Sequence, residues 1–109
     1  MKNNFPQKAR DLFDKGGYMN SWDNHGTSDA DCLHHILGRC SNSIYNAAPL
    51  NNFRDHMPEG RNAQGYPSLS SPLVISRYLK KTKKYLDSIE YIPNENDKEF
   101  LKKYTKYYK

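Results

Sequence analysis

Residues 32–56 read CLHHILGRCSNSIYNAAPLNNFRDH and contain three of the four histidines of the chain. Two short apolar runs in this stretch are bounded by polar residues, a pattern that is typical of β-strands. We therefore expect one strand over residues 32–37 and a second over residues 47–50, joined by a polar loop.

A short helix is expected directly after the second strand. It would begin at Asn51 or Asn52, carry His56, and end at Pro58 and Gly60, two residue types that interrupt or terminate helices. The predicted order is strand, loop, strand, helix, and it would turn the last histidine back toward the first strand.

Helices are also expected on both sides of this core. Near the N-terminus, apolar residues recur at helical spacing from Phe5 to Phe13, with Asn4 as a cap and Gly16 and Gly17 as the stop. Trp22 falls in the polar loop that follows, and we expect it to fill a gap in the core. The loop histidine, His25, is an additional candidate for a ligand or a phosphate contact.

The C-terminal third predicts two more helices after a polar connector over residues 58–70. Ser71 followed by Pro72 is a helix start. The first helix would bury a stripe with helical spacing: Ile75, Leu79, Thr82, Leu86 and Ile89. The second would be capped by Asn94 or Asn96, and its apolar face would be formed by four residues: Phe100, Leu101, Tyr104 and Tyr108.

The composition indicates one small domain with a lean core. The chain has 109 residues, of which 36% are hydrophobic, so a bound metal ion or a partner would help to stabilise it. Two cysteines, Cys32 and Cys40, are too few for a disulfide framework, and we expect free thiols, with zinc ligation as the minor alternative. We find no membrane-spanning run or signal peptide and expect a cytoplasmic protein without a membrane partner.

The positive charge is concentrated near the C-terminus. Residues from Arg77 onward include ten basic and five acidic residues, whereas the first 76 residues carry seven of each. This accounts for the net charge of +5. A basic surface of this kind often binds phosphate, with Lys80 and Lys84 as candidate contacts, although lysine-rich helix faces are also simply solvated.

The histidines carry the candidate chemistry. Neutral imidazole binds transition metals and also accepts protons near neutral pH. His34 and His35 can divide these two tasks, but adjacent residues of a regular strand point to opposite faces, so one shared site requires an irregular backbone near Gly38. His56 is the candidate second ligand. Three further residues are candidates for an additional oxygen ligand or for holding a bound water: Asn51, Asn52 and Asp55.

Other polar residues suit supporting roles in such a site. Asn46 can hydrogen-bond the backbone of the histidine loop and fix its shape. Three arginines are candidate phosphate contacts, because guanidinium matches phosphate oxygens in bidentate geometry: Arg39, Arg54 and Arg61.

The order His34-His35-Ile36 with Gly38-Arg39, then residues 46–50 (NAAPL), then His56, resembles the HNH endonucleases, also called ββα-metal or His-Me finger nucleases. The resemblance covers about a quarter of the chain. It implies metal ligands at His34 and His56, a general base at His35 and a structural asparagine at Asn46. It also implies a ββα-metal (HNH) core, and compact proteins of this family are often encoded by phages, which would place the protein inside the host cell.

The sequence also departs from the family pattern. Cys-x-x-Cys zinc pairs are absent, and Gly60 stands where many members have another histidine. Two imidazole ligands favour Mn, Ni or Zn, while Mg with an asparagine or aspartate ligand, such as Asn52, is the alternative. The fold expected is α+β, with a single domain over residues 1–109, a core over about 30–60 and a basic helical extension over about 71–109.

The sequence thus predicts an endonuclease that hydrolyses DNA phosphodiesters with one divalent metal ion and His35 as the base. DNA binding through the basic helices would weaken strongly with salt. The alternative is a non-catalytic, metal-stabilised DNA-binding or accessory module of a larger assembly, and a third is a basic RNA-binding protein. A protein partner or a homodimer formed through the C-terminal helices is a further possibility.

Overall fold

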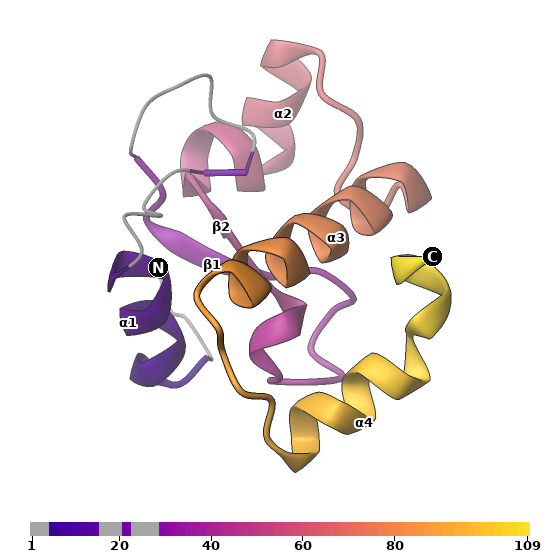
Figure 1. Ribbon diagram of the computed structural model, residues 1–109. Coiled ribbons are helices and arrows are strands. Elements are labelled where there is room, and N and C mark those ends of the chain that lie inside the picture. Colours follow the sequence, from indigo (N-terminus) through magenta and orange to yellow (C-terminus); the bar gives the residue numbers. More distant parts are fainter. Residues whose placement is uncertain (1–4, 16–20, 23–28) are drawn as a thin grey trace.

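The computed structural model describes residues 5–15, 21–22 and 29–109, and it has α+β architecture (Figure 1). The expected cap at Asn4, the expected stop at Gly16 and Gly17, and His25 lie outside the described residues. The elements follow in this order: α1 (Gln7–Lys15), β1 (Cys32–His35), η1 (Ile44–Asn46), β2 (Ala47–Leu50), η2 (Asn52–His56), α2 (Pro58–Gln64), α3 (Pro72–Ser88), α4 (Glu95–Lys103) and η3 (Thr105–Tyr108).

The two strands form an antiparallel sheet in which each histidine of β1 faces an alanine of β2. His34 lies opposite Ala48, and His35 lies opposite Ala47. Pro49 lies opposite Leu33, at a pair whose backbone N–H groups point away from the partner strand in the alternating antiparallel pattern. The missing N–H of proline therefore removes no hydrogen bond between β1 and β2.

The second strand has the predicted bounds, but the first ends two residues earlier than predicted. The backbone turns after His35, and Gly38 has a φ of +86°, a left-handed conformation that favours glycine. Asn46 holds this turn, because its Oδ1 accepts a hydrogen bond of 2.9 Å from the Leu37 N–H. The backbone is irregular near Gly38, but only beyond both histidines, so His34 and His35 stay on opposite faces of β1 and the backbone irregularity required for one shared site is not found between them.

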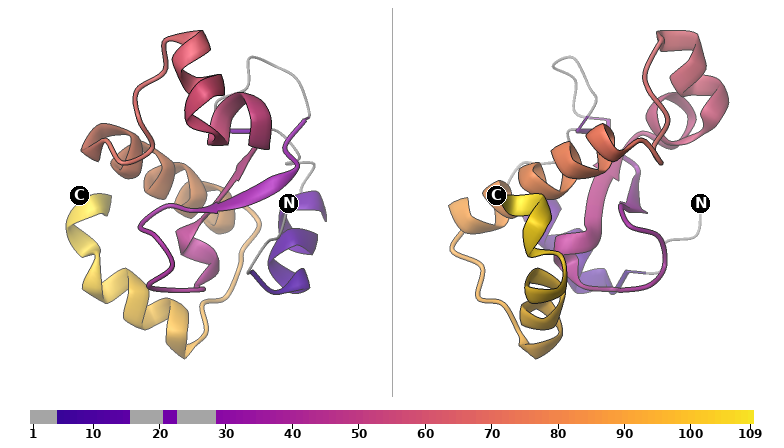
Figure 2. Two further views of the ribbon diagram at one scale, coloured as in Figure 1. Left: turned by 180° about the vertical axis from the view of Figure 1, so that it is seen from behind. Right: turned by 90° about the vertical axis from the view of Figure 1, so that its right-hand side faces the viewer.

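Helix α3 packs against β2 and η1 (Figure 2). Its buried face differs slightly from the predicted stripe. Ile75 and Ile89 are only partly buried, while tyrosines join the central residues of the face. The residues buried on α3 are Val74, Tyr78, Leu79, Thr82, Tyr85 and Leu86. Trp22 is buried, as predicted, and its Nε1 donates a hydrogen bond of 3.1 Å to Thr82 Oγ1.

The connector predicted over residues 58–70 is wrong in its first half, because α2 occupies Pro58–Gln64. Pro58 begins this helix instead of ending the previous one, since proline is well tolerated in the first helical turn. The short helix η2 does carry His56, but it ends there, and Gly60 lies inside α2. The polypeptide therefore forms two consecutive short helices where we expected one.

Helices α1 and α4 lie on either side of η1 (Figures 1 and 2). Helix α4 begins with the cap predicted at Asn94, whose side chain accepts from the Asp97 N–H, while Asp97 accepts from the Asn94 N–H in return. Within the described residues, no helix is both long and apolar enough to cross a membrane.

Candidate metal centre

The structure brings His34 and His56 together although 21 residues separate them in the sequence. His34 is on β1 and His56 is the last residue of η2, and their ring centroids lie 4.9 Å apart. This confirms the expectation that the turn after β2 directs His56 back toward the first strand. The small side chain of Ala48, opposite His34 in the sheet, leaves room for the two rings.

Burial keeps both imidazoles neutral. It lowers the pKa of His34 to about 3, with smaller contributions in the same direction from His56, His35 and Arg61. The pKa of His56 is also lowered, chiefly by burial and then by Arg61, with Asp31 acting in the opposite direction. The neutral form is the one that binds metal ions.

One ring nitrogen of this pair lacks a hydrogen-bond partner among the described residues. His34 Nε2 is buried and has no hydrogen-bond partner in the described parts of the chain. A buried polar atom without a partner costs about 1–3 kcal/mol, and a divalent cation would supply one. The residues at this site therefore fit a bound metal ion.

Asn52, a predicted oxygen ligand, contacts His56 directly. Its Oδ1 lies 3.0 Å from His56 Nδ1. An amide oxygen can only accept a hydrogen bond, so Nδ1 carries the proton and the lone pair of the neutral ring is on Nε2. Metal-binding histidines are commonly oriented by such a hydrogen bond on their other nitrogen.

Within residues 5–15, 21–22 and 29–109, no group of three His, Cys, Asp or Glu residues is arranged to hold a metal ion. Cys32 Sγ comes within 4.0 Å of His56 Nδ1, but it donates to the Leu50 carbonyl at 3.2 Å, and burial raises its pKa to about 12. Without a bound metal ion, Cys32 is therefore a protonated thiol.

Gly60 lies where a side chain has no room. A Cβ atom at position 60 would lie 2.0 Å from the backbone oxygen of Phe53 and 2.5 Å from that of Arg54. Helix α2 packs against η2 so closely that no side chain fits between them. A ligand at position 60 is therefore excluded by the packing that places His56.

Gly60→Ala is expected to lower the free energy of unfolding by about 3 kcal/mol or more, because the atoms in its way belong to the backbone and overpacking of this kind is costly. Urea unfolding followed by circular dichroism measures the change. Asn62→Ala, at an exposed position of the same helix, is the matched control and should change stability by less than about 0.5 kcal/mol. Equal stability of the two variants would contradict the packing described here.

The metal-free protein is expected to lose stability as the pH falls below about 6.5. In this range the unfolded chain protonates the imidazole of His34, whereas the folded protein, with the pKa of His34 at about 3, does not. The unfolded state thus binds more protons, and each such group lowers the free energy of unfolding by up to about 1.4 kcal/mol per pH unit. Urea unfolding in EDTA between about pH 7 and 4 measures this slope, and His34→Asn should reduce it. An unchanged slope in that variant would rule out His34 as the source.

His35 lies on the other face of the sheet, because adjacent residues of β1 alternate between faces. Its ring stacks on Phe5, with centroids 4.0 Å apart and planes inclined by 16°, and the residue is 9% exposed. Its Nε2 lies 3.0 Å from Asn42 Oδ1. The prediction missed both Phe5 and Asn42, since one resembled an ordinary core residue and the other an ordinary loop asparagine.

Asn46 has the contacts that we predicted for a residue that fixes the loop. It is fully buried, and its Nδ2 donates to the carbonyls of Gly38 (3.1 Å) and Ser41 (2.9 Å). Together with the bond from the Leu37 N–H, these contacts tie both ends of the turn to one side chain. Asn46 thus sets the conformation of the segment that follows His35.

Two of the predicted phosphate contacts belong to an internal network and need correction. Arg54 pairs with Asp29 and with the fully buried Asp55. Arg61 is 2% exposed and donates to the Asp55 carbonyl and to Tyr78 Oη. Arg61 is therefore not available to a phosphate, whereas Arg54 keeps 30% of its side chain exposed but is paired with two carboxylates. Asp55 is fully buried and is engaged by Arg54 and Ser21.

The other predicted phosphate contacts are accessible. Arg39, Lys80 and Lys84 are exposed. Lys80 and Lys84 are one turn apart on α3 and therefore share one side of the helix.

Comparisons with known proteins found no relative of this chain: no family model, curated protein or solved structure matches it.

Proposed function

We propose that the protein is a metal-dependent DNA endonuclease of the HNH type, with a ββα-metal core over about residues 30–60. The observation that carries the proposal is the pair His34 and His56, two neutral imidazoles 4.9 Å apart, one of which has a buried nitrogen that finds no partner among the described residues. The strand, loop, strand and turn that hold this pair occur in the order in which the HNH motif has them.

His34 and His56 would hold one divalent cation through nitrogen, a ligand set that suits Mn, Ni or Zn better than Mg. When bound, this ion would neutralise negative charge that develops on the scissile phosphate and its leaving oxygen. Asn52 would keep His56 in the tautomer that presents Nε2. The depressed pKa of His34 means that protons compete weakly with the cation.

His35 would accept the proton of the attacking water. Its Nε2 faces the amide oxygen of Asn42, so the lone pair of the neutral ring is on Nδ1. The sheet has two strands in the described residues, and the outer edge of β1 pairs with no third strand there. A phosphate lying along this edge would have His34 on one face of the strand and His35 on the other.

DNA would be held mainly by contacts with its phosphates. Arg39 follows the turn after β1, and Lys80 and Lys84 extend from α3 into solvent. Contacts of this kind position the duplex without reading its sequence, and binding then weakens steeply with salt. We therefore expect weak sequence preference.

A metal-stabilised DNA-binding module without catalytic activity is the second candidate. It is favoured by the stacking of Phe5 on His35, which leaves the imidazole little exposed. Thermal melting with and without chelator, run beside a plasmid nicking assay, separates the two. A metal-dependent rise in melting temperature together with nicking supports the nuclease, while the same rise without nicking in any metal supports the module.

A further inference from the structure

We propose that Asn42 is a positioning residue that fixes His35 in the tautomer with its proton on Nε2 and its lone pair on Nδ1. The inference rests on the proposed function, because it identifies the atom of His35 that would take the proton from water. Asn42 itself would touch neither the substrate nor the metal ion.

The hydrogen bond between the two residues determines the tautomer. His35 Nε2 and Asn42 Oδ1 are 3.0 Å apart. An amide oxygen has no proton to give, so the imidazole must be the donor, and a neutral imidazole carries only one N–H. Without this acceptor, the ring would divide between its two tautomers, and one of them has no lone pair on Nδ1.

The residues on both sides of Asn42 are anchored, so its Cα is held within reach of His35 before any ligand binds. On one side, the Ser41 carbonyl accepts from Asn46 Nδ2 at 2.9 Å. On the other, Ser43 Oγ donates to the buried carboxylate of Asp97 at 2.7 Å. The asparagine that fixes the loop therefore also places the one that orients His35.

The plane of the His35 ring is fixed by a separate contact. Phe5 stacks against it at 4.0 Å, with an interplanar angle of only 16°. Rotation of the imidazole about its bond to Cβ would drive its edge into the phenyl ring. The stack and the hydrogen bond together leave one orientation for Nδ1.

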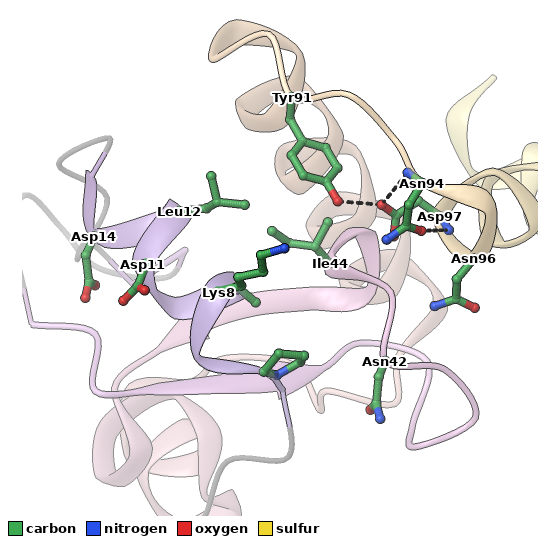
Figure 3. A pocket seen from close by; sticks show the side chains of 12 residues that line it. Lys8, Asp11, Leu12, Asp14, Asn42, Ile44, Tyr91, Asn94, Asn96 and Asp97 are labelled. Carbon is green, nitrogen blue, oxygen red and sulfur yellow. Dashed lines mark hydrogen bonds between the residues drawn. The ribbon is translucent and has the colours of Figure 1, made fainter.

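Asn42 can be replaced without removing buried packing. Its side chain is exposed and borders a cavity of about 910 Å³ between α1, the loop before η1 and the start of α4. Figure 3 shows Asn42 at the border of this cavity, apart from the hydrogen-bonded group of Tyr91, Asn94 and Asp97. Asn96 borders the same cavity and is also exposed, so it serves as a matched control.

The test is the tautomer of His35, read from long-range 1H–15N NMR spectra of the metal-free protein at about pH 8, where an imidazole is ordinarily neutral. Wild type and Asn96→Ala should show the Nε2–H form. Asn42→Ala should show a mixture of both forms, and Asn42→Asp, which keeps an acceptor, should restore the Nε2–H form.

Plasmid cleavage provides the second readout. Asn42→Ala should lower kcat about tenfold, the effect of one hydrogen bond lost in the transition state, without changing KM. Asn42→Asp should recover most of this loss, and Asn96→Ala should cut like wild type. An Asn42→Ala protein that keeps the Nε2–H form overturns the inference, whether or not the wild type cuts DNA. The expected tautomers in a wild type that cuts no DNA support the positioning and count against the nuclease.

Discussion

Replacing His35 by alanine is expected to lower the rate of DNA cleavage by about 10²- to 10⁴-fold, the range that a positioned general base contributes. His35 is the histidine that β1 places on this face, and its Nε2 lies 3.0 Å from Asn42 Oδ1. Metal binding should persist, because the rings of His34 and His56 meet on the other face. Initial rates on supercoiled plasmid and calorimetric titration with Mn²⁺ measure the two properties separately.

The variant also loses the stack with Phe5, so its stability must be measured beside its activity. A folded His35→Ala protein that binds Mn²⁺ and DNA like the wild type, but does not cut, is the expected outcome. Cleavage at the wild-type rate by that same protein would remove His35 from the mechanism.

His56→Ala is expected to abolish both metal-dependent stabilisation and cleavage. A ligand that binds only the folded state adds about 2.7 kcal/mol when its concentration is 100 times Kd, and His56 is one of two imidazoles available to provide that affinity. Asn52→Ala is the graded control: it keeps both imidazoles but loses the bond to His56 Nδ1. Its metal affinity should fall about 10- to 100-fold.

Thermal melting in EDTA and in excess Mn²⁺ measures this prediction. The melting temperature of the wild type should rise with metal, that of Asn52→Ala should rise less at the same concentration, and that of His56→Ala should not change. An equal rise in the wild type and in His56→Ala would place the cation elsewhere.

Local sequence patterns correctly predicted the strand bounds and helix starts that depend on neighbouring residues alone. The bounds of β2 follow from a short apolar run between polar neighbours, and Asn94 and Pro72 mark helix starts through their own backbone preferences. The proximity of His34 and His56 was also predictable, because a short turn after an antiparallel strand returns the chain to the partner strand.

Interactions between distant segments explain the errors. Arg61 looks like a surface residue in the sequence, but inside the protein it donates hydrogen bonds to the Asp55 carbonyl and to Tyr78 Oη. Helix α2 was missed because Pro58 and Gly60 were interpreted as a stop, whereas close packing on η2 requires that glycine. Asn42 contacts His35 only because Asn46 folds the loop between them, and no spacing rule encodes that contact.

The most direct measurement is conversion of supercoiled plasmid by the purified protein in Mg²⁺, Mn²⁺, Ni²⁺, Zn²⁺ and EDTA, with His35→Ala in parallel. We expect nicked or linear product in at least one metal, none in EDTA, and a loss of about 10²-fold or more in the variant. A folded, metal-loaded wild-type protein that leaves the plasmid intact in every lane would contradict the account.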